Sequence, residues 1–264
     1  MAINSRKIAF KVLIDIDANK KFSNLALNKH LNNEEISQLD RRFIRQLVYG
    51  VLENKLYIDY VISTYSKTPL RKININILNL LRLGIYQIKF LDKVPNSAAV
   101  NETVKITKKT QFKLAGFVNG ILRSYIRNPE KVVLPDREKN PIQYLGIKYS
   151  FPEWLVKKWL DRFSLGFTED LLMASNSIPK LYIRTNTLKI ERNELISVLE
   201  KENCQCEEGL IDEAIIVRST SAPIDTLKSF KDGLFTIQDL SSMFVGRVLN
   251  PNQGDTVIDL CSAP

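Results

Sequence analysis

Cysteine and histidine, two residue types that commonly act as nucleophiles or hold zinc, are scarce in this sequence. The cysteines are Cys204, Cys206 and Cys261, and the single histidine is His30. The two neighbouring cysteines offer half of a metal site, but His30 lies far away in the sequence, so a zinc ion would lack ligands. We therefore predict no metal site. An odd number of cysteines without disulfide-framework spacing indicates a reducing compartment, and we expect a cytoplasmic protein.

The last residues of the sequence, TVIDLCSAP, have the pattern of a ligand-binding loop. Residues 256–260 are predicted to form a short buried strand, and small residues follow it. A strand that runs into a small-residue turn commonly opens a ligand-binding α/β unit, because small side chains let backbone N–H groups approach the ligand. The candidate residues of this ligand-binding loop are Asp259, Cys261, Ser262, Ala263 and Pro264.

Charge divides the sequence into two parts of opposite sign. Residues 1–131 hold 23 Lys and Arg against 10 Asp and Glu, a net charge of +13, whereas residues 132–264 hold 15 against 19, a net charge of −4. This asymmetry favours an N-terminal module that binds a polyanion. A basic surface kept only for solubility is the alternative. The candidate phosphate contacts are Arg6, Lys7, Arg41, Arg42 and Arg45.

The polyanion is expected to be a nucleic acid and not a membrane. The basic residues are scattered over several predicted helices and do not gather on one amphipathic face. No apolar run approaches the roughly 18 residues needed to span a bilayer. The N-terminal stretch carries acidic residues and lacks a small-residue cleavage site, so it is not expected to be a signal peptide.

Helical periodicity dominates the sequence up to about residue 130. Apolar residues recur three or four apart, and Ser5 and Asp40 stand where N-caps of two helices are expected. Residues 75–91 are apolar almost all round, which predicts the central buried helix of a bundle. We therefore expect an all-α unit of six or seven helices.

The stretch 127–141 is charged and punctuated by proline, and it is the predicted domain boundary. A helix is expected to begin at Pro152, with Trp154 and Trp159 on its packed side. Helical and strand patterns then alternate. Strands are expected at 180–186, 213–217, 232–237 and 256–260, and helices at 191–202 and 239–249.

Five blocks, in the same order along the chain, resemble one known family. They are DKVPNSAAVNETVKITKK, AGFVNGILR, IKYSFPEWLVKKWL, IRTNTLK and FTIQDLSSMFVGRVLNPNQGDTVIDLCSAP. Together they are similar to the RsmB family of bacterial small-subunit ribosomal RNA cytosine-5 methyltransferases, also called Sun or Fmu. The resemblance runs along nearly the whole chain, and the order of the blocks makes it specific.

The resemblance implies a domain order. A NusB-like RNA-binding helical domain would occupy 1–131, a linker 132–144, and a small α+β subdomain similar to an RNA-recognition fold 145–237. Residues 238–264 would be the first helix and strand of a Rossmann-like methyltransferase domain that binds S-adenosylmethionine. The fold class expected is thus multidomain, all-α followed by α+β.

The resemblance also implies which chemistry is missing. The family's cofactor motif continues with two glycines and a lysine after the residue matched by Pro264, and its two catalytic cysteines follow later still. We therefore assign no catalytic residue in this chain. Ser262 stands where the family commonly has Ala, and Phe151 and Leu240 stand where it often has His and Glu. The last two departures put polar contacts at those positions in doubt.

Two classes of function follow. The first is methylation of carbon 5 of a cytosine in 16S ribosomal RNA, with this chain as the RNA-binding and catalytically incomplete portion of a monomeric enzyme. The second is a non-catalytic NusB-like module for RNA binding or antitermination. The match beyond the helical part favours the first.

Overall fold

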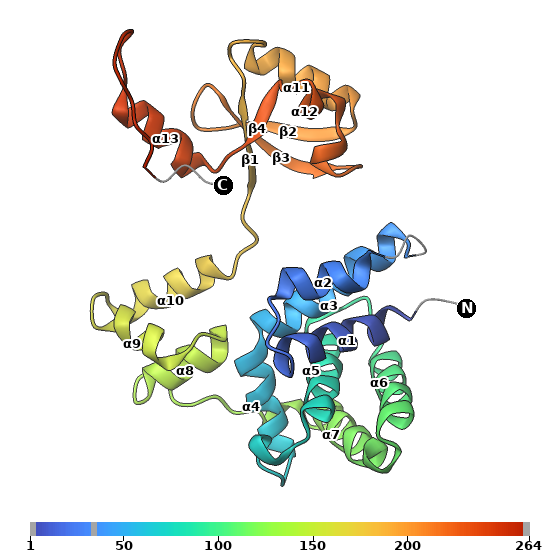
Figure 1. Cartoon of the computed structure of the whole chain (residues 1–264). Helices are drawn as coiled ribbons and strands as arrows, with labels where there is room; N and C mark the ends of the chain where they lie inside the picture. The colour runs from blue at the N-terminus through green and yellow to red at the C-terminus, as the bar shows by residue number, and fades with distance from the viewer. Residues whose placement is uncertain (1–3, 33–35, 261–264) are drawn as a thin grey trace. The chain divides into compact units, whose positions relative to one another are not determined.

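The computed structural model describes residues 4–32 and 36–260 (Figure 1). The chain divides into two compact units, Met1–Ser177 and Ile178–Pro264. The first unit is helical and the second contains the sheet. Each unit is described by itself below. In the described part of the chain, no helix is both long enough and apolar enough to cross a bilayer.

Seven α-helices of the first unit wrap a shared apolar core. They are α1 (Ser5–Asp17), α2 (Ser23–Leu31), α3 (Gln38–Glu53), α4 (Lys55–Tyr65), α5 (Ile75–Phe90), α6 (Asn96–Thr110) and α7 (Ala115–Arg127). Single 3₁₀ turns connect or extend them: η1 (Leu70–Lys72), η2 (Phe112–Leu114) and η3 (Pro129–Lys131).

Helix α5 is the central element of this core. Every residue from Ile77 to Gln87 is buried, and α1, α3, α4, α6 and α7 all contact it. Its all-round apolar sequence leaves no face suited to water, so the other helices must surround it. The prediction of a central buried helix is confirmed.

Two predicted helix caps are corrected by the structure. Asn4, and not Ser5, caps α1, because its side chain accepts the Lys7 backbone N–H at 2.9 Å. Ser37, and not Asp40, caps α3 by accepting the Asp40 backbone N–H at 3.1 Å. Asp40 instead accepts hydrogen bonds from the hydroxyls of Ser5 and Ser37, at 2.5 and 2.6 Å. It therefore joins the first turns of α1 and α3.

Three further helices complete the first unit. They are α8 (Pro141–Tyr149), α9 (Glu153–Leu160) and α10 (Leu165–Ser175). Leu145, Val156 and Leu172 form their small apolar core, and Trp159 packs against it. Trp154 is 66% exposed, so its predicted place on the packed side of α9 was wrong.

The second unit contains a four-stranded antiparallel sheet within the described residues, with the order β2-β3-β1-β4. Its elements are β1 (Leu181–Thr185), α11 (Arg192–Lys201), β2 (Cys204–Glu208), β3 (Ala214–Thr220), η4 (Ile224–Thr226), α12 (Lys228–Lys231), β4 (Phe235–Ile237) and α13 (Leu240–Leu249). The expected strands near 180–186, 213–217 and 232–237 are confirmed, whereas β2 was not predicted.

Two helices cover opposite faces of this sheet. Leu195 and Leu199 of α11 pack against Ile183 and its neighbours to form the main core. Met243 of α13 packs on the other face, against Tyr182 and Ala214. Alternating residues of β1 thus contact different helices, because successive side chains of a strand point to opposite faces.

The expected strand at 256–260 is not present in the structure. Residues 256–259 have neither helical nor strand conformation. Val257, Ile258 and Leu260 are 53%, 74% and 91% exposed. The apolar pattern favours a buried strand, but no described strand pairs with this segment, and an unpaired strand has no partner for its backbone groups.

Candidate nucleic-acid interface

Helix α3 presents two unpaired arginines to solvent. Its buried side carries Ile44, Leu47 and Val48, which leaves Arg42 and Arg45, three residues apart, on the exposed side. Within the part of the chain that the structure describes, neither guanidinium has a hydrogen-bond or ion-pair partner. Two uncompensated cations on one helix face are suited to contact successive phosphates.

Helix α1 contributes one exposed and one engaged cation. Lys7 is exposed. Arg6 is half-buried, donates its Nε hydrogen to Gln87 Oε1 at 2.5 Å, and lies 5.2 Å above the centre of the Phe43 ring. Burial lowers the pKa of Arg6 from its ordinary value. Arg6 therefore ties α1 to α5 and α3, which leaves it less able to turn toward a ligand than Lys7.

Arg41 also contributes to the fold. Its Nε donates to the Ile36 carbonyl at 3.0 Å, and its Nη1 donates to the Leu31 carbonyl. Leu31 is the last residue of α2, whose terminal carbonyls lack partners within the helix. Arg41 thus fixes the connection between α2 and α3. Of the candidate phosphate contacts, the structure leaves Lys7, Arg42 and Arg45 most open.

A cavity of about 500 Å³ lies between α6 and α7 and was missed by the sequence reading. Its lining contains no carboxylate and is rich in amide and guanidinium groups, with Arg123 Nε donating to Asn119 Oδ1 at 2.9 Å. The sequence signal was available, since Asn119 and Arg123 stand four apart on one helix face. The lining residues are Asn96, Ser97, Val100, Asn101, Asn119, Gly120, Arg123, Ile126 and Arg127.

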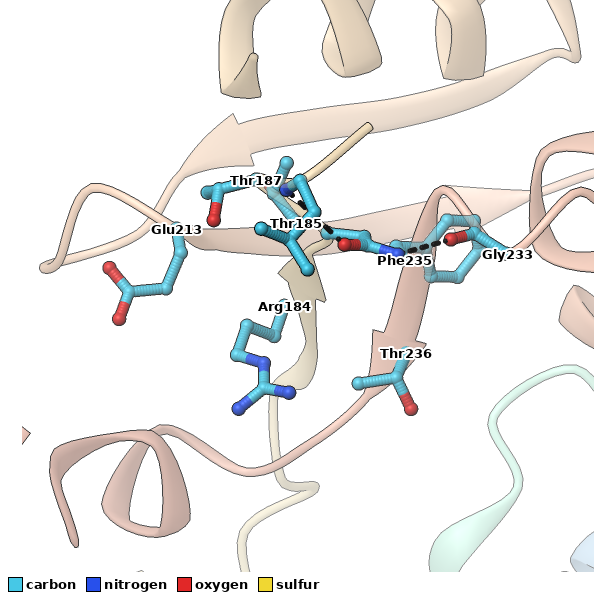
Figure 2. A pocket seen from close by; sticks show the side chains of 9 residues that line it. Arg184, Thr185, Thr187, Glu213, Gly233, Phe235 and Thr236 are labelled. Carbon is cyan, nitrogen blue, oxygen red and sulfur yellow. Dashed lines mark hydrogen bonds between the residues drawn. The ribbon is translucent and has the colours of Figure 1, made fainter. Parts of the chain in front are cut away.

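A second cavity, of about 700 Å³, opens in the second unit where β1 ends and β4 begins (Figure 2). We call it the β1 pocket. Arg184 and Glu213 bring opposite charges to it, and the other lining side chains are polar or apolar. The lining residues are Arg184, Thr185, Asn186, Thr187, Leu188, Glu213, Gly233, Phe235 and Thr236.

The predicted cofactor loop lies mostly outside the described residues. The residues outside the described ranges are Cys261, Ser262, Ala263 and Pro264. Asp259 is described and lies in the exposed segment without regular structure. S-adenosylmethionine needs a loop held by a buried strand. The described residues near Asp259 provide no such support, so they do not fit this cofactor.

The described cysteines are poor nucleophiles. Cys204 is buried at the start of β2, and burial raises the pKa of Cys206 to about 11. A thiol with so high a pKa stays protonated near neutral pH, and the thiolate is the reactive form. Among the described residues, no group of three or more His, Cys, Asp or Glu side chains is placed to hold a metal ion.

Two family models match successive parts of the chain. Residues 3–127 match the NusB family. Residues 151–224 match the ferredoxin-like domain of RsmF/B-like methyltransferases. The order β2-β3-β1-β4 with α11 and α12 as crossovers fits that description.

Curated relatives match the chain from end to end. It is 37% identical over 260 residues to a probable ribosomal RNA small subunit methyltransferase B of Bacillus subtilis (strain 168), covering 98% of this chain and 57% of the relative. It is 35% identical over 266 residues to the protein of the same name from Synechocystis sp. (strain ATCC 27184 / PCC 6803 / Kazusa). That match covers 99% of this chain and 59% of the relative. The chain thus spans less than two thirds of these relatives.

One solved structure shares the fold along the chain. The crystal structure of PH0851 matches with a TM-score of 0.65 at 21% identity, covering 100% of this chain and 59% of that one. At this identity the likeness concerns the fold alone.

Proposed function

Because this chain belongs to the RsmB family, whose N-terminal portion it matches, we propose that it binds small-subunit ribosomal RNA for a cytosine-5 methyltransferase. The proposal rests on one observation above all. In the part matched to the NusB family, Arg42 and Arg45 are exposed on one face of α3 without partners among the described residues. Phosphate binding would supply the missing counter-charge.

The basic surface proposed for RNA is formed by α1 and α3. It comprises Lys7, Arg42 and Arg45, which make the direct contacts, and Arg6 and Arg41, which hold their helices in place. Asp40 joins the first turns of these two helices through Ser5 and Ser37. The cations are therefore presented from one rigid scaffold, which reduces the entropy lost when RNA binds.

Methyl transfer from S-adenosylmethionine to cytosine carbon 5 is proposed for the family protein as a whole. Cys204 is buried, and burial raises the pKa of Cys206 to about 11, so neither is suited to be the nucleophile of this chemistry. We therefore expect this chain alone to bind RNA without catalysing the reaction. A stand-alone NusB-like module is disfavoured, because the match continues through the ferredoxin-like domain.

Helix α13 supports a methyltransferase domain beside the sheet unit. Four apolar residues line a groove of about 380 Å³ on its outer side: Phe244, Val245, Val248 and Leu249. Val245 and Val248 are 67% and 82% exposed. We propose that this face packs against the part of the family protein that the chain does not span.

Three further properties are proposed from the family resemblance. Domain boundaries are proposed at 131/132, 144/145 and 237/238, and the protein is proposed to be monomeric and cytoplasmic.

The double variant Arg42→Gln/Arg45→Gln tests the RNA-binding role. Loss of two phosphate contacts should make the slope of log affinity against log salt shallower by about 1.5 on a small-subunit ribosomal RNA fragment. The matched control is Lys228→Gln/Lys231→Gln, which removes two exposed charges from α12 in the other unit. If both double variants bind with the wild-type slope, α3 is not the RNA-binding surface.

A further inference from the structure

The β1 pocket has the features of a binding site and no role in the interactions described so far. We infer that it is a subsite for one nucleotide of single-stranded RNA, with Arg184 contacting the phosphate. This inference rests on the proposed RNA-binding function and extends it to the second unit. A cavity of about 700 Å³ lies within the size range of small-ligand pockets, about 300–1,000 Å³.

Arg184 supplies an uncompensated positive charge. Its side chain is exposed and has no hydrogen-bond or ion-pair partner in the described ranges 4–32 and 36–260. Arg184 pairs with Thr236 across β1 and β4, so both side chains lie on one face of the sheet, as Figure 2 shows. A guanidinium beside a hydroxyl matches the oxygens of a phosphate.

The other lining residues differ in what they offer a ligand. Thr185 is 2% exposed, and its Oγ1 makes no hydrogen bond. Thr185 follows Arg184 in β1, so its side chain lies on the other face of the sheet, and its buried Oγ1 is closed to a ligand in the pocket. Leu188, 96% exposed, adds an apolar contact for a ribose or base.

The loop that forms the pocket wall is held rigidly. The Asn186 side chain donates to the Gly233 carbonyl at 2.9 Å and accepts the Leu188 backbone N–H at 3.3 Å. Lys189 Nζ donates to the Asp232 carbonyl at 2.8 Å. The pocket is therefore formed before a ligand arrives, which lowers the cost of binding.

The acid in the pocket does not repel an anion strongly. Glu213 accepts hydrogen bonds from Arg247 of α13 at 2.7 and 3.3 Å, so its charge is offset within the fold. The same helix covers the sheet at Tyr182 and Ala214 through Met243. Bases therefore cannot stack across the middle of the sheet, as they do on RNA-recognition domains, and the open end at Arg184 is left for the contact.

The test uses the full chain and a short oligouridylate of about ten nucleotides. Arg184→Gln should weaken binding about tenfold at low salt and make the salt slope shallower by about 0.7, the contribution of one single-strand phosphate. Lys201→Gln, the matched control, removes one exposed charge at the end of α11, outside the pocket lining. An Arg184→Gln protein that binds like the control overturns the inference.

Thr185→Val provides an independent measurement. It removes the unpaired hydroxyl and keeps the branched shape, so the thermal midpoint should stay the same or rise. RNA affinity should stay at the wild-type value, because the buried Oγ1 cannot reach the ligand, so a loss equal to that of Arg184→Gln would overturn the assignment of the contact to Arg184. If the wild-type chain binds no RNA at any salt concentration, the proposed function itself fails. If it binds and Arg184→Gln has no effect, only the β1 pocket subsite fails.

Discussion

Replacement of Arg82 by methionine perturbs the charged network that joins three helices around the central core. Arg82 lies in α5 and is 4% exposed. Its guanidinium contacts both carboxylate oxygens of Asp59 in α4 at 2.7 Å and donates to Asp17 of α1 at 2.8 Å. The network therefore sets how α1 lies against α5, and with it the position of the basic surface.

The expected loss follows from the charges left behind. The side chains of Asp17 and Asp59 are 13% and 17% exposed. In the Arg82→Met variant, Asp17 still has an ion pair with Lys55, whose Nζ lies 2.7 Å from Asp17 Oδ1. Asp59 loses its ion-pair partner. Removing one partner of a buried pair typically costs about 3–5 kcal/mol, because the other charge stays desolvated. We expect the free energy of unfolding to fall by about 3 kcal/mol.

Urea unfolding with tryptophan fluorescence measures this change, since Trp154 and Trp159 both lie in the helical unit. In the double variant Arg82→Met/Asp59→Asn, the unpaired carboxylate of Asp59 is removed as well. The free energy of unfolding should therefore be about 1–2 kcal/mol higher than in Arg82→Met alone. A loss below about 1 kcal/mol for Arg82→Met, or no recovery in the double variant, would refute the reasoning.

Three further predictions follow from the structure. Gly50→Ala should destabilise the helical unit by about 1–3 kcal/mol, measured by thermal unfolding, because an added Cβ would meet the Tyr86 ring at about 2.0 Å. Lys148 and Arg137 lower the pKa of Glu169 to about 2 from an ordinary 4.5. Its contribution to stability is therefore present above about pH 4.5 and lost as pH falls toward 2, and Glu169→Gln should flatten the stability profile in that window. Incubation with labelled S-adenosylmethionine and small-subunit RNA should give no cytosine label above a denatured control, and label above it would contradict the proposal that this chain alone does not catalyse methyl transfer.

Helices were the part of the fold that the sequence predicted best. A 3.6-residue apolar period is a local signal, as in α3, and the all-round apolar sequence of α5 predicted its burial. Strand β2 was missed because its sequence, CQCEE, lacks the usual apolar alternation. It pairs with β3 through a register shift between Gln205 and Cys206. That pairing depends on residues distant in sequence and could not be inferred locally.

The candidate site illustrates the same limit. Arg6 and Arg41 were as plausible as Arg42 and Arg45 for phosphate contact, since all four are basic residues on predicted helices. Their use inside the fold depends on Gln87 and on the Leu31 and Ile36 carbonyls. Backbone carbonyls carry no sequence signature, so neither role was visible from residue type.

The most direct test of RNA binding is the affinity of the full chain for small-subunit ribosomal RNA as a function of salt. The basic surface predicts that log affinity falls linearly with log salt, by about a thousandfold between about 50 and 200 mM if roughly six phosphates are contacted. An affinity that stays constant over this range, or no binding at the lowest salt, would contradict RNA binding by this chain.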